Sequence, residues 1–379
     1  LAYFFMGIPA GKMLVRVGYK KTALIGIAIG FFGVLTQFCS GFFTDAKITG
    51  FVIYLLGAFI SGFCVCMLNT VVNPMLNLIG GGGNRGNQLN MIGGTLNSLS
   101  GTLTPLFVGS LIGEVTKNTS IIDVNPVLYI AMGVFVAAFV ILSYIPIQDP
   151  KNSKTGTNVT FEYSPWNFRH FVLGAIAIFV YVGVEVGIPG TLIYYLSDTT
   201  GLGGGLPKAT ATAIAASVAA TYWFLMLIGR FIAGFIASKI SSKTLMSCTT
   251  ILAMILITTA IVLGKSAAVS MPAFTGSAFN MVVVPVSALL LVLCGLCTSV
   301  MWPCIFNLAT EGLGKYTEPA SGIFMMMVVG GGLLPLLQNF IADQSGYLVS
   351  YFVPLAGVAY MCFYTLIGSK NVNKDIPVD

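Results

Sequence analysis

The chain has 379 residues, of which 8% are charged and 56% are hydrophobic, and its mean hydropathy is +0.92. An ordinary soluble domain carries about 25% charged residues, so this chain has too little polar surface for a water-soluble globule. Its formal net charge of +6 does not indicate nucleic-acid binding, because the basic residues lie singly or in pairs between apolar stretches. We therefore expect a protein embedded in a lipid bilayer, without a nucleic-acid partner.

The apolar stretches predict membrane-spanning helices. Many are about 20 residues long or longer, the length at which a helix crosses a hydrocarbon core of ~30 Å. Alternating strand patterns are absent, so a closed barrel is not expected. Hydropathy predicts eleven spans, at residues 1–15, 22–43, 50–79, 88–113, 125–147, 168–197, 209–238, 243–264, 283–313, 319–342 and 347–368. The chain enters the first span at Leu1, so we expect it to have lost N-terminal sequence.

A polar stretch at 148–165 separates five predicted spans from six. We expect an N-terminal helical bundle at 1–147, a cytoplasmic linker at 148–165 and a C-terminal helical bundle at 166–379. The halves resemble each other: Pro74 and Pro105 are spaced much like Pro303 and Pro335. Parallel repeats joined by a polar linker are typical of two-bundle transporters.

Basic residues predict the orientation. If the connector at 16–21 is cytoplasmic, that side carries Lys12, Arg16, Lys20, Lys21, Arg85, Lys151, Lys154, Arg169, Lys239, Lys243, Lys315, Lys370 and Lys374. The other side carries Lys47, Lys117, Lys208 and Lys265. The positive-inside rule then predicts a multi-pass protein of the plasma membrane with a cytoplasmic C-terminus.

Glu185 is the acidic residue that lies deep in a predicted span. A charge at a helix centre costs roughly 2.5–3.5 kcal/mol on insertion scales, so it faces a cavity or a partner. We interpret Glu185 as a coupling residue that binds Na⁺ or exchanges a proton. The alternative is a structural pair with Arg230. Counted from the cytoplasmic ends at 1.5 Å per residue, the two lie at depths of roughly 20 and 12 Å, which makes a direct pair strained.

Asparagines recur inside the spans. Asn69, Asn73 and Asn77 are four residues apart and share one helix face. An amide both donates and accepts hydrogen bonds, as sugar hydroxyls require; the alternative is a bridge between helices, worth about 0.6–2 kcal/mol. We expect Asn69 and Asn73 to line a cavity and Asn77 to be structural. For Asn97 and Asn307 both interpretations stay open.

Aromatic residues give a second set of candidates. Trp302 precedes Pro303, and a proline within a span permits bending. An indole there can stack on a sugar and donate its N–H, or it can simply pack at the kink. Tyr181, Tyr222 and Trp223 are weaker candidates of the same kind. Arg230, beside Gly229, is expected to help close the cytoplasmic side through backbone carbonyls.

Several motifs resemble a known family. Gly11-Lys-Met-Leu-Val-Arg16-Val-Gly18-Tyr-Lys20-Lys21 resembles the signature loop after the second helix of the major facilitator superfamily, with Val15 where an acidic residue is usual. The segments 68–74, 89–90 and 97–98 are similar to the fourth and fifth helices of its fucose–proton and glucose/galactose symporter family. Segments 181–187, 229–232, 302–306 and 330–332, followed by Pro335, match later helices of that family.

The resemblance implies an all-α membrane protein with a two-bundle transporter fold, of whose twelve helices eleven are visible. It implies import of a hexose by symport with Na⁺ or H⁺ through alternating access, in a bacterial inner membrane and as a monomer. Other cofactors and metals are not expected. Gly11, Arg16, Gly18 and Arg230 then take gating roles, and Asn69, Asn73, Asn97, Tyr181, Trp302 and Asn307 contact the sugar. Asn69 replaces the carboxylate of the fucose symporter, which favours glucose or galactose over fucose.

Other functions remain as alternatives. A transporter that exports an amphipathic compound would need a more hydrophobic and aromatic cavity than the amide-bearing face of residues 69–77 suggests. An intramembrane enzyme needs a nucleophile, base or metal cluster, yet the chain has one histidine, His170, and no clustered acids, so catalytic residues are not expected. A sensor would normally carry a soluble signalling domain, whereas the tail after Gly368 is short.

Overall fold

The computed structural model describes the chain except residues 44–45, 113–120, 148–160, 276–277 and 379, and except the side chains of 101–102, 105–110, 112 and 121. The described part is mostly helical and contains nine helices long and apolar enough to cross a membrane. The chain is therefore an integral, multi-pass membrane protein, as its composition predicts. Most of the linker expected at 148–165 lies outside the described residues.

Four long helices precede that segment: α1 (Ala2–Cys39), α2 (Lys47–Ile79), α3 (Gly83–Ile112) and α4 (Asn125–Tyr144). The spans predicted at 1–15 and 22–43 are two helices that α1 joins across a kink, and this kink lies within the connector expected at 16–21. The helix breaks at one residue, Gly18, with φ 82° and ψ 176°. Glycine adopts a positive φ without steric cost, so a single residue turns the chain where a loop was expected.

The second group contains α5 (Arg169–Ser197), α6 (Ala211–Ile236), α7 (Ser242–Leu263), α8 (Val286–Thr298), α9 (Met301–Thr310), α10 (Thr317–Met326), α11 (Gly330–Ser345), α12 (Tyr347–Ser350) and α13 (Phe352–Phe363). The last continues as a π-helical turn at Tyr364–Gly368. Two predicted spans are each divided: 283–313 holds α8 and α9, and 319–342 holds α10 and α11. The first break lies just before Pro303, whose missing N–H weakens the helix there.

The structure also contains a β-hairpin, which the hydropathy pattern did not predict. β1 (Ala268–Phe274) pairs antiparallel with β2 (Phe279–Pro285), with Ala268 opposite Pro285. Hydropathy placed residues 283–285 in a helical span, because a short apolar run can be either a strand or a buried helix segment. The β-branched run 282–284 favours the strand, and Pro285 ends it before α8 begins.

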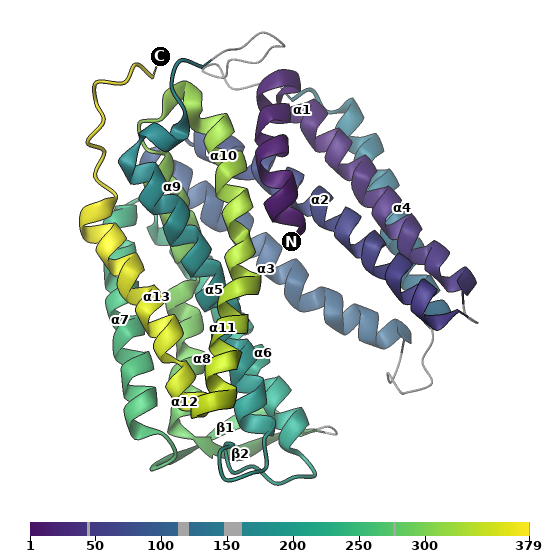
Figure 1. The fold of residues 1–379 in the computed structure, drawn as a ribbon, viewed down its shortest axis with the longest axis vertical. Coiled ribbons are helices and arrows are strands. Elements are labelled where there is room, and N and C mark those ends of the chain that lie inside the picture. The colour runs from purple at the N-terminus through teal and green to yellow at the C-terminus, as the bar shows by residue number, and fades with distance from the viewer. Residues whose placement is uncertain (44–45, 113–120, 148–160, 276–277, 379) are drawn as a thin grey trace.

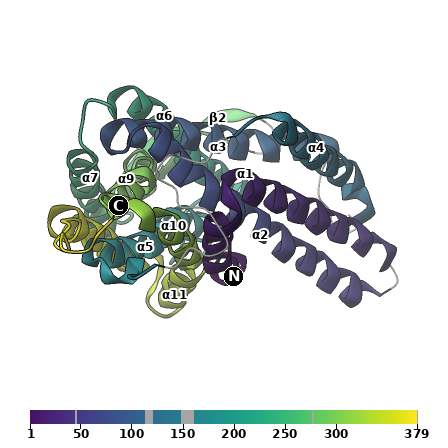
Figure 2. The same ribbon diagram turned by 90° about the horizontal axis from the view of Figure 1, so that it is seen from above.

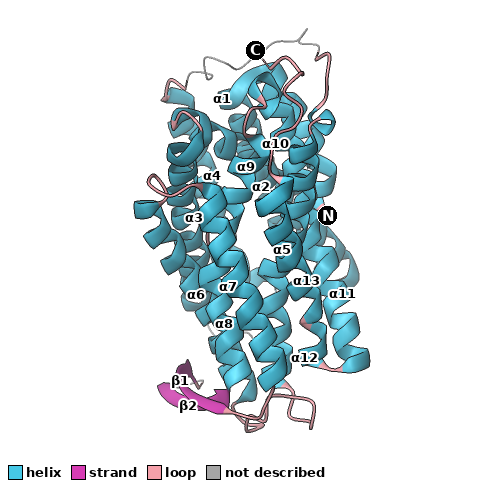
Figure 3. Cartoon of the chain, turned by 90° about the vertical axis from the view of Figure 1, so that its left-hand side faces the viewer, coloured by secondary structure: helices cyan, strands magenta, loops and turns pink. Residues whose placement is uncertain are grey.

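The helices form two bundles that meet on one side and diverge on the other (Figure 1). Helices α1 to α4 make one bundle and α5 to α13 the other, and the view along the axis shows them side by side (Figure 2). Near the C-terminus, α1 packs against α10; we call this the closed side. The hairpin lies at the opposite end of the helices, which we call the open side (Figure 3).

Glycines permit the contact on the closed side. A Cβ on Gly322 of α10 would lie 2.5 Å from the carbonyl oxygen of Gly7 and 2.7 Å from the Cα of Gly11, both in α1. Real Cβ atoms do not approach backbone so closely, so any side chain there forces the helices apart. Small residues let membrane helices pack through their backbones in this way. Nearby, the Tyr19 hydroxyl donates to Glu318 Oε1 at 3.3 Å, which also joins the two bundles.

Gly322→Ala is expected to lower the thermal unfolding temperature of the purified protein. Overpacking of a tight contact typically costs about 1–3 kcal/mol. Gly133→Ala in α4 is the matched control, because a Cβ at that position meets no atom within 4 Å. Equal unfolding temperatures for the two variants would show that the glycine contact is not under the packing constraint described here.

Candidate functional site

A cavity of about 1270 Å³ lies between the two bundles. It extends to Pro272 and Phe279 of the hairpin, so it opens toward the open side. Both bundles contribute polar and aromatic side chains, namely Tyr3, Asn69, Asn73, Asn90, Asn97, Ser98, Glu185, Ser217, Thr221, Trp223, Phe224, Arg230 and Trp302. A large concave site with a few convergent polar groups is the usual form of a small-molecule site.

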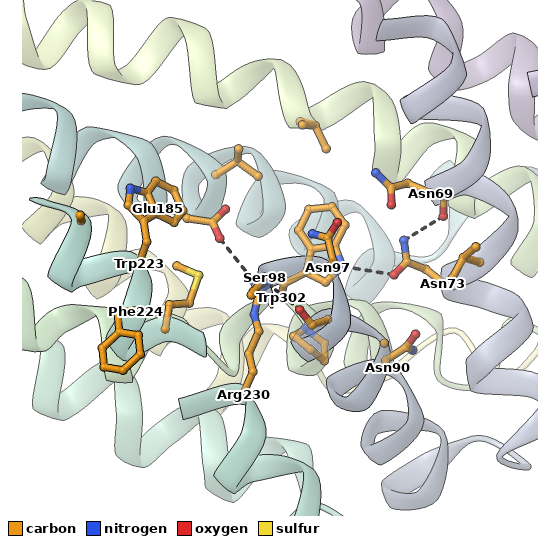
Figure 4. Close-up of a pocket in the computed structure, with 18 of the residues that line it drawn as sticks. Asn69, Asn73, Asn90, Asn97, Ser98, Glu185, Trp223, Phe224, Arg230 and Trp302 are labelled. Carbon is orange, nitrogen blue, oxygen red and sulfur yellow. Dashed lines mark hydrogen bonds and ion pairs between the residues drawn. The ribbon is translucent and has the colours of Figure 1, made fainter. Parts of the chain in front are cut away.

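The N-terminal bundle supplies an amide wall (Figure 4). Asn69 and Asn73 face the cavity from α2, one helical turn apart, and Asn97 faces it from α3. Asn69 Nδ2 donates to the Tyr3 hydroxyl at 2.8 Å, and Asn73 Nδ2 donates to the backbone oxygen of Asn69 at 2.8 Å. These bonds orient the amides while each keeps further hydrogen-bonding capacity. The structure therefore places Asn69, Asn73 and Asn97 together, on one cavity.

Asn90 is a cavity residue that the sequence interpretation did not single out. It is 5% exposed, and neither its Nδ2 nor its Oδ1 has a hydrogen-bond partner in the described part of the chain. A buried amide without a partner costs free energy unless something else satisfies it. Its distance of seven residues from Asn97 is a signal that was present, since i and i+7 share a helix face. Asn90 is thus a buried amide of this wall whose hydrogen-bonding capacity the described residues leave unused.

Trp302 closes one side of the amide wall. Its Nε1 donates to Asn73 Oδ1 at 3.4 Å, and its ring packs edge-on against Phe324 with centroids 5.9 Å apart. The indole N–H is therefore engaged with the protein, rather than free in the cavity. The indole also links the C-terminal bundle to the amides of α2.

Glu185 and Arg230 form a direct ion pair, so the expectation that this pair is strained is wrong. Arg230 Nη2 lies 3.3 Å from Glu185 Oε1, and their side chains are 10% and 15% exposed. The expected offset came from counting each residue's depth along an ideal, untilted helix. Such a count leaves out helix tilt and the length of the arginine side chain. Both residues line the cavity, so pairing and a functional role are compatible.

Arg230 also contacts the other bundle. Its Nη1 donates to Ser98 Oγ at 2.7 Å and to the Gly94 carbonyl at 3.3 Å, both on α3. Its Nε donates to the Ser299 carbonyl at 3.1 Å, within the C-terminal bundle. Backbone carbonyls were the expected partners, but they lie at the wall of the central cavity. One guanidinium therefore connects the carboxylate of Glu185 to α3.

Two predicted sugar contacts lie outside the cavity. Tyr181 is fully buried and donates its hydroxyl to Glu185 Oε1 at 2.8 Å. Asn307 accepts from Asn77 Nδ2 at 3.3 Å and donates to Ser242 Oγ at 2.9 Å. Spacing along one helix cannot tell which neighbouring helix covers a residue, so both positions were misplaced. Of the weaker candidates, Trp223 lines the cavity, whereas Tyr222 is buried and bonds Thr298.

The predicted gating residues lie toward the closed side, except Arg230. Gly11 lies in the contact with Gly322, Gly18 forms the break in α1, and Arg16 is exposed. Sequence reasoning missed further bonds between the bundles: Gln88 Nε2 donates to the Gly234 carbonyl at 2.7 Å, and Ser321 Oγ donates to the Thr70 carbonyl at 3.0 Å. Together with the Asn77–Asn307 bond, these hydrogen bonds between neutral groups join the two bundles on the closed side.

The described residues contain no group of three or more histidine, cysteine or acidic side chains that could hold a metal ion. What the cavity offers is hydrogen bonding, aromatic surface and one carboxylate paired with a guanidinium. The hydrogen-bonding and aromatic groups suit a polar, uncharged ligand, and the carboxylate of Glu185 is a group that can bind one cation.

Comparisons with known proteins agree with this architecture. A glucose/galactose transporter of Brucella abortus is 31% identical over 375 residues, which cover 98% of this chain and 83% of the relative. The L-fucose-proton symporter of Escherichia coli is 23% identical over 368 residues, covering 91% and 77%. The crystal structure of FucP in the outward conformation has the same fold, with a TM-score of 0.79, 19% identity and coverage of 98% and 88%.

Residues 1–334 match the Major Facilitator Superfamily. Two helical bundles around a central cavity, and relatives similar over nearly the whole chain, accompany that match. The chain belongs to the major facilitator superfamily.

Proposed function

We propose that this protein imports a hexose, glucose or galactose, by proton symport with alternating access. The observation that carries the proposal is the amide-lined cavity between the bundles, open on one side and closed on the other. The names of the relatives, a glucose/galactose transporter and an L-fucose-proton symporter, support a sugar as the substrate.

Hydroxyl recognition follows from the amide wall. A hexose presents several groups that each donate and accept hydrogen bonds, and Asn69, Asn73, Asn90 and Asn97 offer both kinds of partner. Asn90 adds to this preference, because its buried, unpaired amide gains hydrogen bonds that it otherwise lacks. Trp302 offers its ring as a flat apolar surface for the C–H face of the sugar.

The direction of opening follows from the charge pattern. The closed side carries the C-terminus and the concentration of lysine and arginine. By the positive-inside rule this side is cytoplasmic, so the cavity faces outward in this structure. The transport cycle then requires the cytoplasmic contacts to break as the outer side closes.

Glu185 is the proposed coupling site. A proton on this carboxylate removes the charge that pairs with Arg230, which leaves the guanidinium to Gly94 and Ser98 of α3 and to Ser299. Protonation then favours the outward-open contacts and raises sugar affinity there. A proton needs only the carboxylate, whereas a metal cation needs several oxygen ligands and would lie beside the guanidinium. The geometry therefore favours H⁺ over Na⁺.

Uptake into proteoliposomes tests substrate and ion together. With an inward proton gradient, labelled glucose or galactose is expected to accumulate above equilibrium, and a Na⁺ gradient alone is expected to give only equilibration. Accumulation driven by Na⁺ would overturn the choice of ion. Failure of folded protein to transport or exchange either hexose would exclude the sugar and leave efflux of an amphipathic compound as the next function to test.

Asn90→Ala is expected to raise the KM for galactose by about tenfold or more, because loss of hydrogen bonds worth about 1.4 kcal/mol changes binding tenfold. Protein stability is expected to stay nearly unchanged, because Asn90 has no hydrogen-bond partner among the described residues. Asn87→Ala is the matched control: Asn87 lies on the same helix but donates to Cys304 Sγ at 3.7 Å outside the cavity. Equal effects of the two substitutions on KM would contradict the assignment.

Glu185→Gln is expected to abolish accumulation against a gradient while galactose exchange at equilibrium continues. The amide retains the shape of the side chain but cannot exchange a proton. Glu318→Gln is the control, since Glu318 is also a buried carboxylate but lies at the closed side beside Tyr19. It is expected to change rates without removing accumulation. Concentrative uptake by Glu185→Gln would show that Glu185 is a packing residue.

A further inference from the structure

The hairpin presents an unpaired apolar face at the mouth of the cavity. Its register sets Phe274 opposite Phe279 and Pro272 opposite Met281, and residues directly opposite each other share one face. Phe274, Phe279, Met281 and Val283 on this face are 39%, 77%, 66% and 63% exposed. Such a contiguous apolar surface is costly in water and usually marks a place where something docks.

The other face of the hairpin is fixed to the C-terminal bundle. Met271, Ala273 and Val284 alternate with the exposed residues and are 5%, 0% and 1% exposed. The backbone N–H of Phe274 donates to Ser217 Oγ at 2.8 Å, and Ser217 lines the cavity from α6. The hairpin therefore moves with α6 and keeps its exposed face directed away from its own bundle.

Across the mouth from this face lies α3. Pro272 and Phe279 line the same cavity as Gly94, Asn97 and Ser98 of α3. The C-terminal part of α3 diverges from the C-terminal bundle and runs toward the open side (Figure 1). Thr104 and Leu111 in this outer part of α3 are exposed. Closure of the outer side would bring this segment toward the hairpin.

We propose that the apolar face of the hairpin is a docking surface for the outer half of α3, so that the hairpin seals the outer mouth when the bundles close. This inference rests on the alternating access of the proposed function. The cavity-lining position of Phe279 and Pro272 selects this partner, since a surface for lipid or for a second copy would not face the cavity. Burial of the face against α3 stabilises the outward-closed state.

Thiol labelling tests whether the face becomes covered. In a background with Cys39 and Cys248 replaced by serine, Met281→Cys is expected to react with a membrane-impermeant maleimide and to be protected several-fold by saturating galactose. Met281 does not line the cavity, so bound sugar does not cover it directly. Asn280→Cys, its exposed neighbour on the other face, is expected to react equally with and without galactose. Reactivity of Met281→Cys only after detergent extraction would assign the face to lipid and overturn the proposal.

Cross-linking tests the partner and does not depend on the sugar. Phe279→Cys combined with Thr104→Cys or Leu111→Cys is expected to form a disulfide under mild oxidation, because thermal opening and closing brings the segments together; a disulfide requires Cβ atoms ~4 Å apart. Thr70→Cys with Ser321→Cys across the closed side is the positive control. If that pair forms and neither hairpin pair does, with or without galactose, the docking surface is wrong even where hexose uptake is intact. A disulfide between two protein molecules would assign the face to a second copy.

Uptake by side-chain variants gives a third readout. Phe279→Ser is expected to lower the maximal uptake rate several-fold, and Phe279→Leu to restore most of it, because the docked face needs apolar area rather than an aromatic ring. Asn280→Ser is expected to behave as the unaltered protein. Full-rate uptake by Phe279→Ser combined with Met281→Ser would overturn the proposal.

Discussion

The buried guanidinium of Arg230 is the contact that ties the two bundles to the central cavity. A charge in the interior of a membrane protein persists only when a partner and hydrogen bonds satisfy it. Here Glu185 supplies the opposite charge, while Ser98, Gly94 and Ser299 accept three further N–H groups. Loss of one of these partners leaves the guanidinium dependent on the others. This requirement relates the ionisation of Glu185 to the relative position of α3 and α6.

The closed side depends on contacts of a different kind. Gly7, Gly11 and Gly322 bring backbones together, and the amides of Asn77, Gln88 and Asn307 join the helices around them. Hydrogen bonds between membrane helices contribute only about 0.6 kcal/mol each on average. Individually weak hydrogen bonds, most of them between neutral groups, hold the helices together over a surface of glycines. Such contacts suit a side that closes and opens in the proposed transport cycle.

The open side is organised around the hairpin rather than around helix ends alone. One face, with Met271, Ala273 and Val284, secures it to the bundle, and the other remains apolar and exposed. The two sides thus differ in their surfaces: the open side presents an exposed apolar face, whereas the closed side is held by close backbone approach and amide hydrogen bonds. In the proposed transport cycle, each state would leave one of these surfaces unsatisfied, which would keep the two states close in free energy.

The sequence alone determined that the protein lies in a lipid bilayer, that it is helical and that its helices form two bundles. Composition and hydropathy are sufficient for these conclusions, because they depend only on which residues are present and in what order. It also identified Asn69 and Asn73 as neighbours on one helix face, since helical periodicity is local. The tertiary structure decided the rest. It paired Glu185 with Arg230 against the estimate of their depths, covered Tyr181 and Asn307 with neighbouring helices, and placed the buried, unpaired amide of Asn90 at the cavity wall. These outcomes depend on helix tilt, on side-chain reach and on which helices become neighbours, and none of these is encoded in the spacing of residues along one helix.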